Sequence, residues 1–336
     1  MKIFITGISY YLPNKVLDNA ALSQLHPEWS VEKITAKTGI AERRIAAEDE
    51  FSSDMGIKAA EKLFKEFEIK KESVDFLLFC TQSPDYFLPT TACILQEKIG
   101  LNKNIGALDF NLGCSGFVYG IGLAKGLIAT GQAKNVLLIT SETYSKFIHP
   151  DDKSNKTLFG DAAAATFITS QPSGMGAEIQ DFAYGTDGSG AEYLIVRNGG
   201  MRKKGVKGAD VFNEGGFERN DDYLYMDGKA IFNFTAFQIP GLINQTLKRN
   251  NLVMDEIDQF IFHQANEFML HTVRKRAKIP EEKFIIDMAN CGNTVSSTIP
   301  IALIHTINNH KIKKGNKVLI AGFGVGLSMG ATVLQF

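Results

Sequence analysis

Three residues that could act together in nucleophilic chemistry each lie at or just after the end of a predicted strand. Cys114 follows an apolar run at residues 104–110 and precedes a helical pattern at residues 118–128. The free N–H groups and dipole of a helix start favour a thiolate over a thiol, so Cys114 is a candidate nucleophile. Taken alone, a cysteine beside a glycine turn is more often a buried and inert side chain.

His263 and Asn293 are the other two candidates. His263 ends the apolar run at residues 257–262, and Asn293 lies in a polar turn after a weaker run at residues 284–287. Taken alone, the histidine fits a satisfied core position and the asparagine fits a cap or turn.

A glycine-rich turn, residues 322–326, follows the last strong strand. It lacks the GxGxxG spacing of a dinucleotide loop and no βαβ unit follows it. A tight turn that offers backbone N–H groups to an oxyanion fits its sequence better.

The elements that would position these residues occur twice along the chain. Three runs of the first half can be aligned, in order, with three of the second: residues 74–81 with 257–264, 109–114 with 287–293, and 135–139 with 317–321. We therefore predict two copies of one βα unit set, each of about 160 residues, at residues 1–170 and 171–336. Ligands gather at the carboxyl ends of strands in open α/β sheets. The three candidates can therefore converge if the halves pack about a pseudo-twofold axis.

A cysteine, a histidine and an asparagine at one site have a specific chemical use. A cysteine thiolate attacks a thioester and becomes acylated. A neutral histidine and an asparagine amide can both donate hydrogen bonds to one thioester oxygen, which stabilises the enolate formed when a malonyl group loses carbon dioxide. Neither donor needs a charge, so the site can remain dry.

Composition excludes several classes of protein. The 336 residues are 44% hydrophobic and 22% charged, and the net charge of −1 gives no general field for nucleic acid or a membrane surface. The four cysteines form no CxxC pair, so neither a zinc site nor a disulfide framework is expected. No apolar run reaches the roughly 18 residues that span a bilayer, and the N-terminus is typical of a strand instead of a signal peptide. We expect a cytoplasmic protein without a metal, a membrane anchor or a nucleic-acid partner.

Six motifs follow one another along nearly the whole chain: Thr38-Gly39-Ile40, Gly113-Cys114-Ser115-Gly116-Phe117, Phe159-Gly160-Asp161-Ala162, His263-Gln264-Ala265-Asn266, Gly292-Asn293-Thr294 and Gly322-Phe323-Gly324-Val325-Gly326. In this order they resemble the β-ketoacyl-acyl-carrier-protein synthase III family, the initiating condensing enzymes of the thiolase superfamily. The resemblance implies an α/β thiolase-like fold with two pseudo-symmetric halves in five layers, αβαβα, and a homodimer.

The resemblance also implies roles for individual residues. Cys114, His263 and Asn293 would form the catalytic triad, and the backbone N–H groups of Cys114 and Val325 would form the oxyanion hole. Four further positions match substrate-binding ones, with Phe87 reaching the acyl pocket of the neighbouring subunit: Phe87, Phe232, Asn266 and Gly324.

The reaction implied is the decarboxylative Claisen condensation of an acyl thioester with malonyl-acyl-carrier protein. An acyl-cysteine would be the intermediate and a 3-oxoacyl-carrier protein the product, in fatty acid biosynthesis. No cofactor would be tightly bound, since coenzyme A thioesters and the phosphopantetheine of the carrier protein are substrates.

Some positions depart from the family pattern on the donor side of the site. The tryptophan that stacks on the coenzyme A adenine is replaced by Lys33, and the only tryptophan, Trp29, lies four residues earlier. The opposing arginine is replaced by Lys153, which would weaken adenine stacking. We therefore leave the donor open between acyl-coenzyme A and acyl-carrier protein. The polar, glycine-rich residues 185–222 are expected to form a surface insertion.

Docking of the carrier protein is a further expectation. The arginine that the family uses for it, just after His263-Gln264-Ala265-Asn266, is replaced by Phe268. Three basic residues on the following predicted helix could meet an acidic carrier protein instead: Arg274, Lys275 and Arg276. The alternative is a solvated helix face.

Two other functions remain compatible with these residues. One is an acyltransferase to oxygen or nitrogen acceptors without decarboxylation, against which Asn293 argues because decarboxylation is the step that needs its amide. The other is an inactive scaffold subunit, against which the complete triad argues. Plant-type polyketide synthases share the triad but match the surrounding motifs less well.

Overall fold

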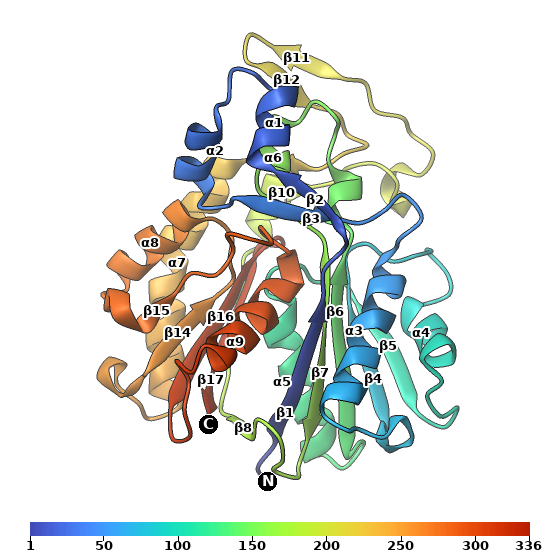
Figure 1. Cartoon of the computed structure of the whole chain (residues 1–336), viewed down its shortest axis with the longest axis vertical. Coiled ribbons are helices and arrows are strands. Elements are labelled where there is room, and N and C mark those ends of the chain that lie inside the picture. Colours follow the sequence, from blue (N-terminus) through green and yellow to red (C-terminus); the bar gives the residue numbers. More distant parts are fainter.

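The computed structural model describes residues 1–336 as an α/β fold around an eleven-stranded sheet (Figure 1). The elements up to residue 169 are β1 (Phe4–Tyr11), β2 (Lys15–Asp18), α1 (Asn19–Leu25), α2 (Val31–Thr38), β3 (Glu42–Ile45), α3 (Ser52–Glu66), β4 (Phe76–Cys80), α4 (Thr91–Ile99), β5 (Gly106–Phe110), α5 (Gly116–Ala129), β6 (Asn135–Glu142), α6 (Lys153–Lys156) and β7 (Ala162–Thr169).

The later elements are β8 (Ala177–Ile179), β9 (Ala183–Thr186), β10 (Leu194–Ile195), β11 (Val211–Asn213), β12 (Gly216–Arg219), β13 (Tyr225–Met226), α7 (Gly228–Arg249), β14 (Gln259–Phe262), α8 (Glu267–Arg276), β15 (Phe284–Ile285), α9 (Thr298–Asn308), β16 (Lys317–Gly324) and β17 (Ser328–Gln335). Short 3-10 helices join them: η1 (Lys71–Ser73), η2 (Tyr144–Phe147), η3 (Gly188–Tyr193), η4 (Met201–Lys203), η5 (Met254–Glu256), η6 (Glu281–Lys283) and η7 (Val295–Ser297).

The sheet contains the same strand arrangement twice. In the order β5-β4-β6-β7-β1, the first three strands are parallel and the last two are paired antiparallel. The order β15-β14-β16-β17-β9 has the same directions. The strands aligned in the sequence, β4 with β14 and β6 with β16, occupy equivalent positions. The two pseudo-symmetric halves are therefore confirmed. β8 pairs with both β1 and β17 and so joins the halves, and the boundary at residues 170/171 stays a prediction.

Helices and sheet halves alternate in five layers. α3 and α4 contact the outer face of one half, α5 and α9 lie between the halves, and α7 covers the other half together with α8. Three large apolar clusters of 18, 24 and 31 buried residues fill the spaces between these layers. Strands such as β4 (FLLFC) are almost continuous apolar runs because both of their faces are covered.

A cap of small elements lies beyond the carboxyl ends of the strands, at the top of Figure 1. It contains α1, α2, the β2–β3 ribbon, α6 and the β11–β12 hairpin. The expectation that residues 185–222 form only a surface insertion is wrong at its start, because Gly185 and Thr186 belong to β9 and pair with β17. This strand is short and contains a glycine, which hides it in the sequence.

None of the helices combines the length and the hydropathy needed to cross a lipid bilayer. All four cysteines are free, and no group of three His, Cys, Asp or Glu side chains could hold a metal ion.

Candidate active site

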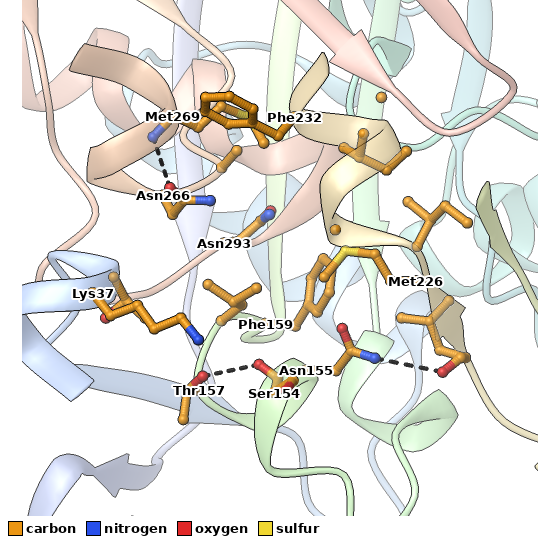
Figure 2. Close-up of a pocket in the computed structure, with 18 of the residues that line it drawn as sticks. Lys37, Ser154, Asn155, Thr157, Phe159, Met226, Phe232, Asn266, Met269 and Asn293 are labelled. Carbon is orange, nitrogen blue, oxygen red and sulfur yellow. Dashed lines mark hydrogen bonds between the residues drawn. The ribbon is translucent and has the colours of Figure 1, made fainter. Parts of the chain in front are cut away.

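One cavity of about 710 Å³ opens between the cap and the carboxyl ends of the strands (Figure 2). Six of the residues singled out in the sequence line it: Cys114, His263, Asn293, Phe232, Asn266 and Gly324. Val325, Phe87 and the basic residues at 274–276 do not. The structure thus brings the three reactive side chains together, from segments up to 179 residues apart in the sequence.

Cys114 lies between the end of β5 and the start of α5, where strand β16 of the other half packs against it. A Cβ atom at Gly322 would lie 2.8 Å from the Cys114 carbonyl oxygen, and one at Gly324 would lie 2.9 Å from its sulfur. The hydroxyl groups of Ser115 and Ser328 are 2.6 Å apart and join the same two segments. Glycines in β16 are therefore what allow the second half to approach the nucleophile.

The thiol of Cys114 is buried, with 6% of the residue exposed. Its pKa is raised to about 12, chiefly by burial and also by the nearby Glu142, although hydrogen bonds from the backbone N–H groups of Cys114 and Val325 lower it. The expectation of a thiolate at the helix start is therefore wrong for the free protein, because desolvation outweighs the helix start. The two N–H groups that face the sulfur are those expected to form the oxyanion hole.

His263 follows β14, and its ring is held by a hydrogen-bond chain that runs through Thr298 to Val295. Its Nδ1 lies 2.8 Å from Thr298 Oγ1, and the Thr298 hydroxyl donates to the Val295 carbonyl oxygen at 3.0 Å. A hydroxyl has one proton, so Thr298 Oγ1 accepts from Nδ1–H and the network assigns the other nitrogen, Nε2, as an acceptor. Burial lowers the pKa of His263 to about 3, which keeps the ring neutral.

Asn293 is held by backbone contacts from the first half of the chain. Its N–H donates to the Leu158 carbonyl at 2.9 Å, and its carbonyl accepts from the Gly160 N–H at 3.0 Å. The side-chain Oδ1 accepts from the Val295 N–H at 3.0 Å, which leaves the amide NH₂ group free to donate. Val295 has a φ of 54°, rare for a β-branched residue, so this turn is strained.

Asn266 and Phe232 lie further out along the cavity wall (Figure 2). Asn266 is also the N-cap of α8, where its Oδ1 accepts from the Met269 N–H at 2.8 Å. Its amide NH₂ group therefore remains available to a ligand. The Phe232 ring stacks on Phe268, with the centroids 5.5 Å apart, and Phe268 is 65% exposed at the mouth.

The mouth of the cavity retains a tryptophan despite the departure from the family pattern. Trp29 lines it from α2's preceding loop, with the Lys37 ammonium 4.7 Å and the Lys33 ammonium 5.5 Å from the ring centroid. Lys153 forms an ion pair with Glu28 at 2.8 Å. Trp29 lies four residues before the position of the family's tryptophan. Its ring still lines the cavity, because the loop before α2 contributes to the lining.

The remaining predicted residues lie outside the cavity. Arg274 has an 11% exposed side chain, and its guanidinium donates to Glu281 and to the Ile279 carbonyl. Lys275 is exposed, and Arg276 stacks over Phe237 at 4.3 Å. Arg274 is therefore engaged within its own subunit, while Lys275 and Arg276 are exposed and form no ion pair.

Phe87 is 78% exposed on the loop after β4, beside Tyr86 at 63% and Leu88 at 86%. None of these three residues lines the cavity of its own chain.

Sequence reasoning missed two residues that shape the site, Thr298 and Glu142. Thr298 sets the tautomer of His263, and Glu142 is a buried acid beside the nucleophile. The signal for Glu142 was an acidic residue at the carboxyl end of an apolar strand, β6. The sequence contains no comparable signal for Thr298, because threonine is common at the start of a helix.

We expect Gly324→Ala to lower the rate of acylation of Cys114 about 100-fold, because the added methyl group would lie within 3 Å of the sulfur and displace it. Mass spectrometry of the intact protein after mixing with an acyl thioester measures this rate. Gly241→Ala, on a helix position with open space around it, is the control and should acylate normally. Normal acylation of Gly324→Ala would contradict the close packing described.

Thr298→Val removes the hydroxyl that fixes His263 Nδ1 but keeps the shape of the side chain. We expect a roughly tenfold loss of acylation rate at unchanged unfolding temperature, because one hydrogen bond that orients the base is lost. Thr306→Val is the control, since Thr306 is buried on the same helix and bonds only to the Ala302 carbonyl. If both variants acylate at the wild-type rate, Thr298 does not orient the histidine.

Comparison with known proteins identifies the family. Residues 108–188 match the model of 3-oxoacyl-[acyl-carrier-protein (ACP)] synthase III, and residues 247–336 match the model of its C-terminal part. The chain is 37% identical to the β-ketoacyl-[acyl-carrier-protein] synthase III of Clostridium perfringens over 329 residues, which cover 98% of each chain.

Comparison with solved structures identifies the same family. A crystal structure of a 3-oxoacyl-(acyl-carrier-protein) synthase III is 46% identical over 100% of both chains, with a TM-score of 0.97. The corresponding enzyme of Pseudomonas aeruginosa is 28% identical over 100% of this chain and 98% of its own, with a TM-score of 0.87. With the thiolase-like fold and the cavity described above, these similarities show that the chain belongs to the β-ketoacyl-acyl-carrier-protein synthase III family of condensing enzymes.

Proposed function

We propose that the protein condenses an acyl thioester with malonyl-acyl-carrier protein through an acyl-cysteine at Cys114, with loss of carbon dioxide. The observation that carries this proposal is the convergence of Cys114, His263 and Asn293 in one cavity. They bring a thiol, a neutral base and a free amide donor to the lining of the same cavity. The four free cysteines fit a reducing cytoplasm, where fatty acid biosynthesis would use the product.

Acylation begins with a thiol, so it needs a base. His263 Nε2 takes the proton as the Cys114 sulfur attacks the thioester carbonyl. The oxyanion that forms accepts hydrogen bonds from the N–H groups of Cys114 and Val325. When the carbon–sulfur bond to the donor breaks, the leaving thiolate takes the proton back from His263. The products are an acyl-cysteine, a free donor thiol and a neutral histidine.

Condensation then uses hydrogen-bond donors. The malonyl carboxylate leaves as carbon dioxide, and the enolate oxygen accepts from the Asn293 amide. His263 can donate as well only in its other neutral tautomer, with the proton on Nε2. The Thr298 hydroxyl supports that tautomer by turning its proton from the Val295 carbonyl to Nδ1. The carbanion attacks the acyl-cysteine carbonyl and expels the Cys114 thiolate, which takes up one proton.

Both substrates would enter through the mouth lined by Trp29, Lys37 and Phe268. A phosphopantetheine arm fits a cavity that is about half apolar, with the Asn266 amide as a donor along its path. An acidic carrier protein would dock against the exposed Lys275 and Arg276 at the C-terminal end of α8, the helix whose first turn supplies Phe268 to the cavity. Because Arg274 is tied to Glu281, the docking proposal no longer includes it.

A homodimer is the assembly we infer from the exposed loop at Phe87. β5 is an edge strand of the sheet, and the loop next to it exposes Tyr86, Phe87 and Leu88. An unpaired edge strand beside a cluster of apolar side chains is a favourable surface for a second copy of the chain.

The two half-reactions can be separated by mutation. Cys114→Ala should take up no labelled acyl group from a thioester donor. Asn293→Ala should still be acylated but should release carbon dioxide from malonyl-acyl-carrier protein about 100-fold more slowly, because one donor to the enolate is lost. A Cys114→Ala protein that became acylated would exclude the nucleophile assignment. Equal loss of both half-reactions in Asn293→Ala would exclude the separate role of the amide.

The dimer is tested by Phe87→Asp, which places a charge on the apolar loop. We expect sedimentation analysis to show a dimer for the wild type and a weakened dimer, with dissociation raised at least about tenfold, for the variant. Tyr193→Asp, at a partly exposed aromatic residue elsewhere, is the control. A wild-type protein that sediments as a monomer at micromolar concentration would contradict the proposal.

A further inference from the structure

Glu142, the last residue of β6, is a buried acid that the reaction described above does not use. It has no exposed surface and forms no ion pair. Burying a carboxyl group without a cation is costly unless hydrogen bonds satisfy it, so its surroundings show what it holds.

The carboxyl group joins two turns of the active site. Both of its oxygens accept from the Gln82 N–H, at 3.1 and 3.0 Å, and one accepts from the Ser83 hydroxyl at 3.0 Å. The other accepts from the Ser296 hydroxyl at 3.4 Å. Gln82 and Ser83 belong to the loop after β4. Ser296 belongs to η7, the turn whose first residue, Val295, fixes the side chain of Asn293.

The loop after β4 leads directly to the nucleophile. The Gln82 amide donates to Asn111 Oδ1 at 3.1 Å and accepts from the Tyr144 hydroxyl at 2.9 Å. It also lies against Gly113, where a Cβ atom would collide with it. Asn111 and Gly113 immediately precede Cys114, so a shift of Gln82 would move the reactive cysteine.

We propose that Glu142 is a positioning residue for the condensation, which holds the segments of Cys114 and Asn293 in register and exerts electrostatic control over the nucleophile. The inference rests on the proposed roles of Cys114 and Asn293. It concerns a residue that contacts no substrate and acts through its neighbours.

The electrostatic part follows from the place of the carboxyl group, which accepts from the Gln82 N–H in the loop that packs against Gly113, beside Cys114. A charge on Glu142 raises the pKa of the Cys114 thiol, the Cys80 thiol and the Tyr144 hydroxyl, and no cation offsets it. Burial raises the pKa of Glu142 to about 8. Below that pH the group is neutral. Above it, the carboxylate is one of the causes that raise the pKa of Cys114, and it opposes formation of the thiolate.

Glu142→Gln tests this control, because glutamine keeps the shape and stays neutral at every pH. Its carbonyl oxygen can accept from the Gln82 N–H and from one of the two serine hydroxyls, and its amide group can donate to the other hydroxyl. The probe is iodoacetamide, and mass spectrometry measures the alkylation rate of Cys114 between pH 6 and 10. We expect equal rates in wild type and variant at pH 6.5. At pH 9.5 we expect alkylation to be about five- to tenfold faster in the variant. Without the carboxylate the pKa of Cys114 falls by up to about one unit, which raises the reactive thiolate fraction about tenfold.

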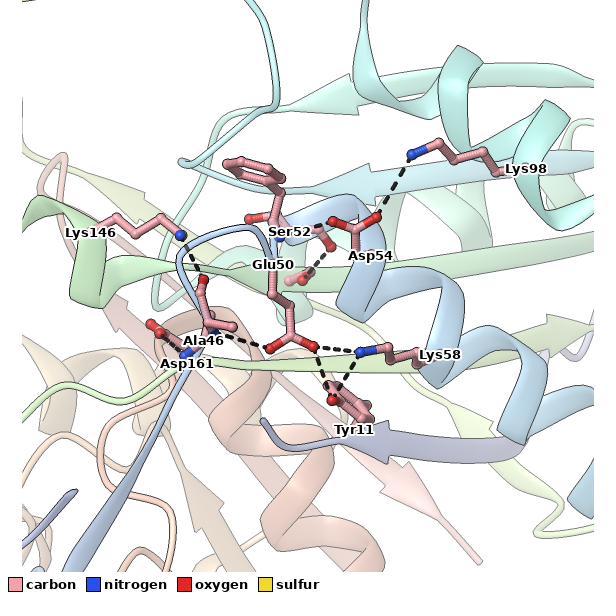
Figure 3. Close-up of polar contacts among 12 residues, drawn as sticks. Tyr11, Ala46, Glu50, Ser52, Asp54, Lys58, Lys98, Lys146 and Asp161 are labelled. Carbon is pink, nitrogen blue, oxygen red and sulfur yellow. Dashed lines mark hydrogen bonds and ion pairs between the residues drawn. The ribbon is translucent and has the colours of Figure 1, made fainter. Parts of the chain in front are cut away.

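Asp161→Asn is the matched control. Asp161 is equally buried, but it accepts from the N–H groups of Ala46 (Figure 3) and Ser145, and it is not among the charges that shift the pKa of Cys114. Its alkylation profile should equal that of the wild type. Superimposed profiles of wild type and Glu142→Gln would overturn the electrostatic role. Alkylation needs no condensation, so this result stands whether or not the proposed function holds.

The positioning part is tested by Ser296→Ala, which removes the hydroxyl that joins the carboxyl group of Glu142 to the turn of Asn293. We expect normal acylation and about fivefold slower release of carbon dioxide from malonyl-acyl-carrier protein, the cost of one lost hydrogen bond. Unchanged release would overturn the coupling. Should Glu142→Gln not fold, as judged by its unfolding temperature, Ser296→Ala decides the proposal. If the wild type itself releases no carbon dioxide, the proposed function fails instead.

Discussion

Close backbone contact between the two halves is the constraint on which the active site depends. Gly322 and Gly324 let β16 lie against Cys114, and Gly160 and Gly292 let the segment of Asn293 lie against the first half. A side chain at these positions would push the halves apart at the point where the reactive groups meet. Because each half supplies a reactive residue that the other half holds in place, neither half can form the site by itself.

The same contact excludes water, and exclusion of water determines the charge state of every reactive group. Burial raises the pKa of Cys114 and of Glu142 and lowers that of His263, so all three favour their neutral forms. A neutral thiol is a poor nucleophile, so the proposed acylation needs a base, and the acceptor nitrogen of His263 is the base that we propose. In return, a dry site protects the acyl-cysteine from hydrolysis while the second substrate binds.

The rest of the cavity lining comes from a different part of the molecule. The cap supplies Trp29 and Lys37, the β11–β12 hairpin supplies Phe217, and α8 supplies Phe268. These residues do not form the hydrogen bonds described for Cys114, His263 and Asn293. Loops tolerate change better than packed strand ends, so this part of the lining can vary without disturbing the three candidate residues.

The sequence by itself determined the strands and their repetition, and it singled out the three candidate residues that the fold brings into one cavity, because strands buried on both faces leave apolar runs and the candidates follow them. Only the tertiary structure decided how those residues behave. The thiol state of Cys114 and the tautomer of His263 depend on burial and on partners that other segments bring. Glu142 meets Gln82 from 60 residues away and Ser296 from 154 residues away. No local sequence pattern predicts such contacts, because the partners come together and lose their water only when the chain folds.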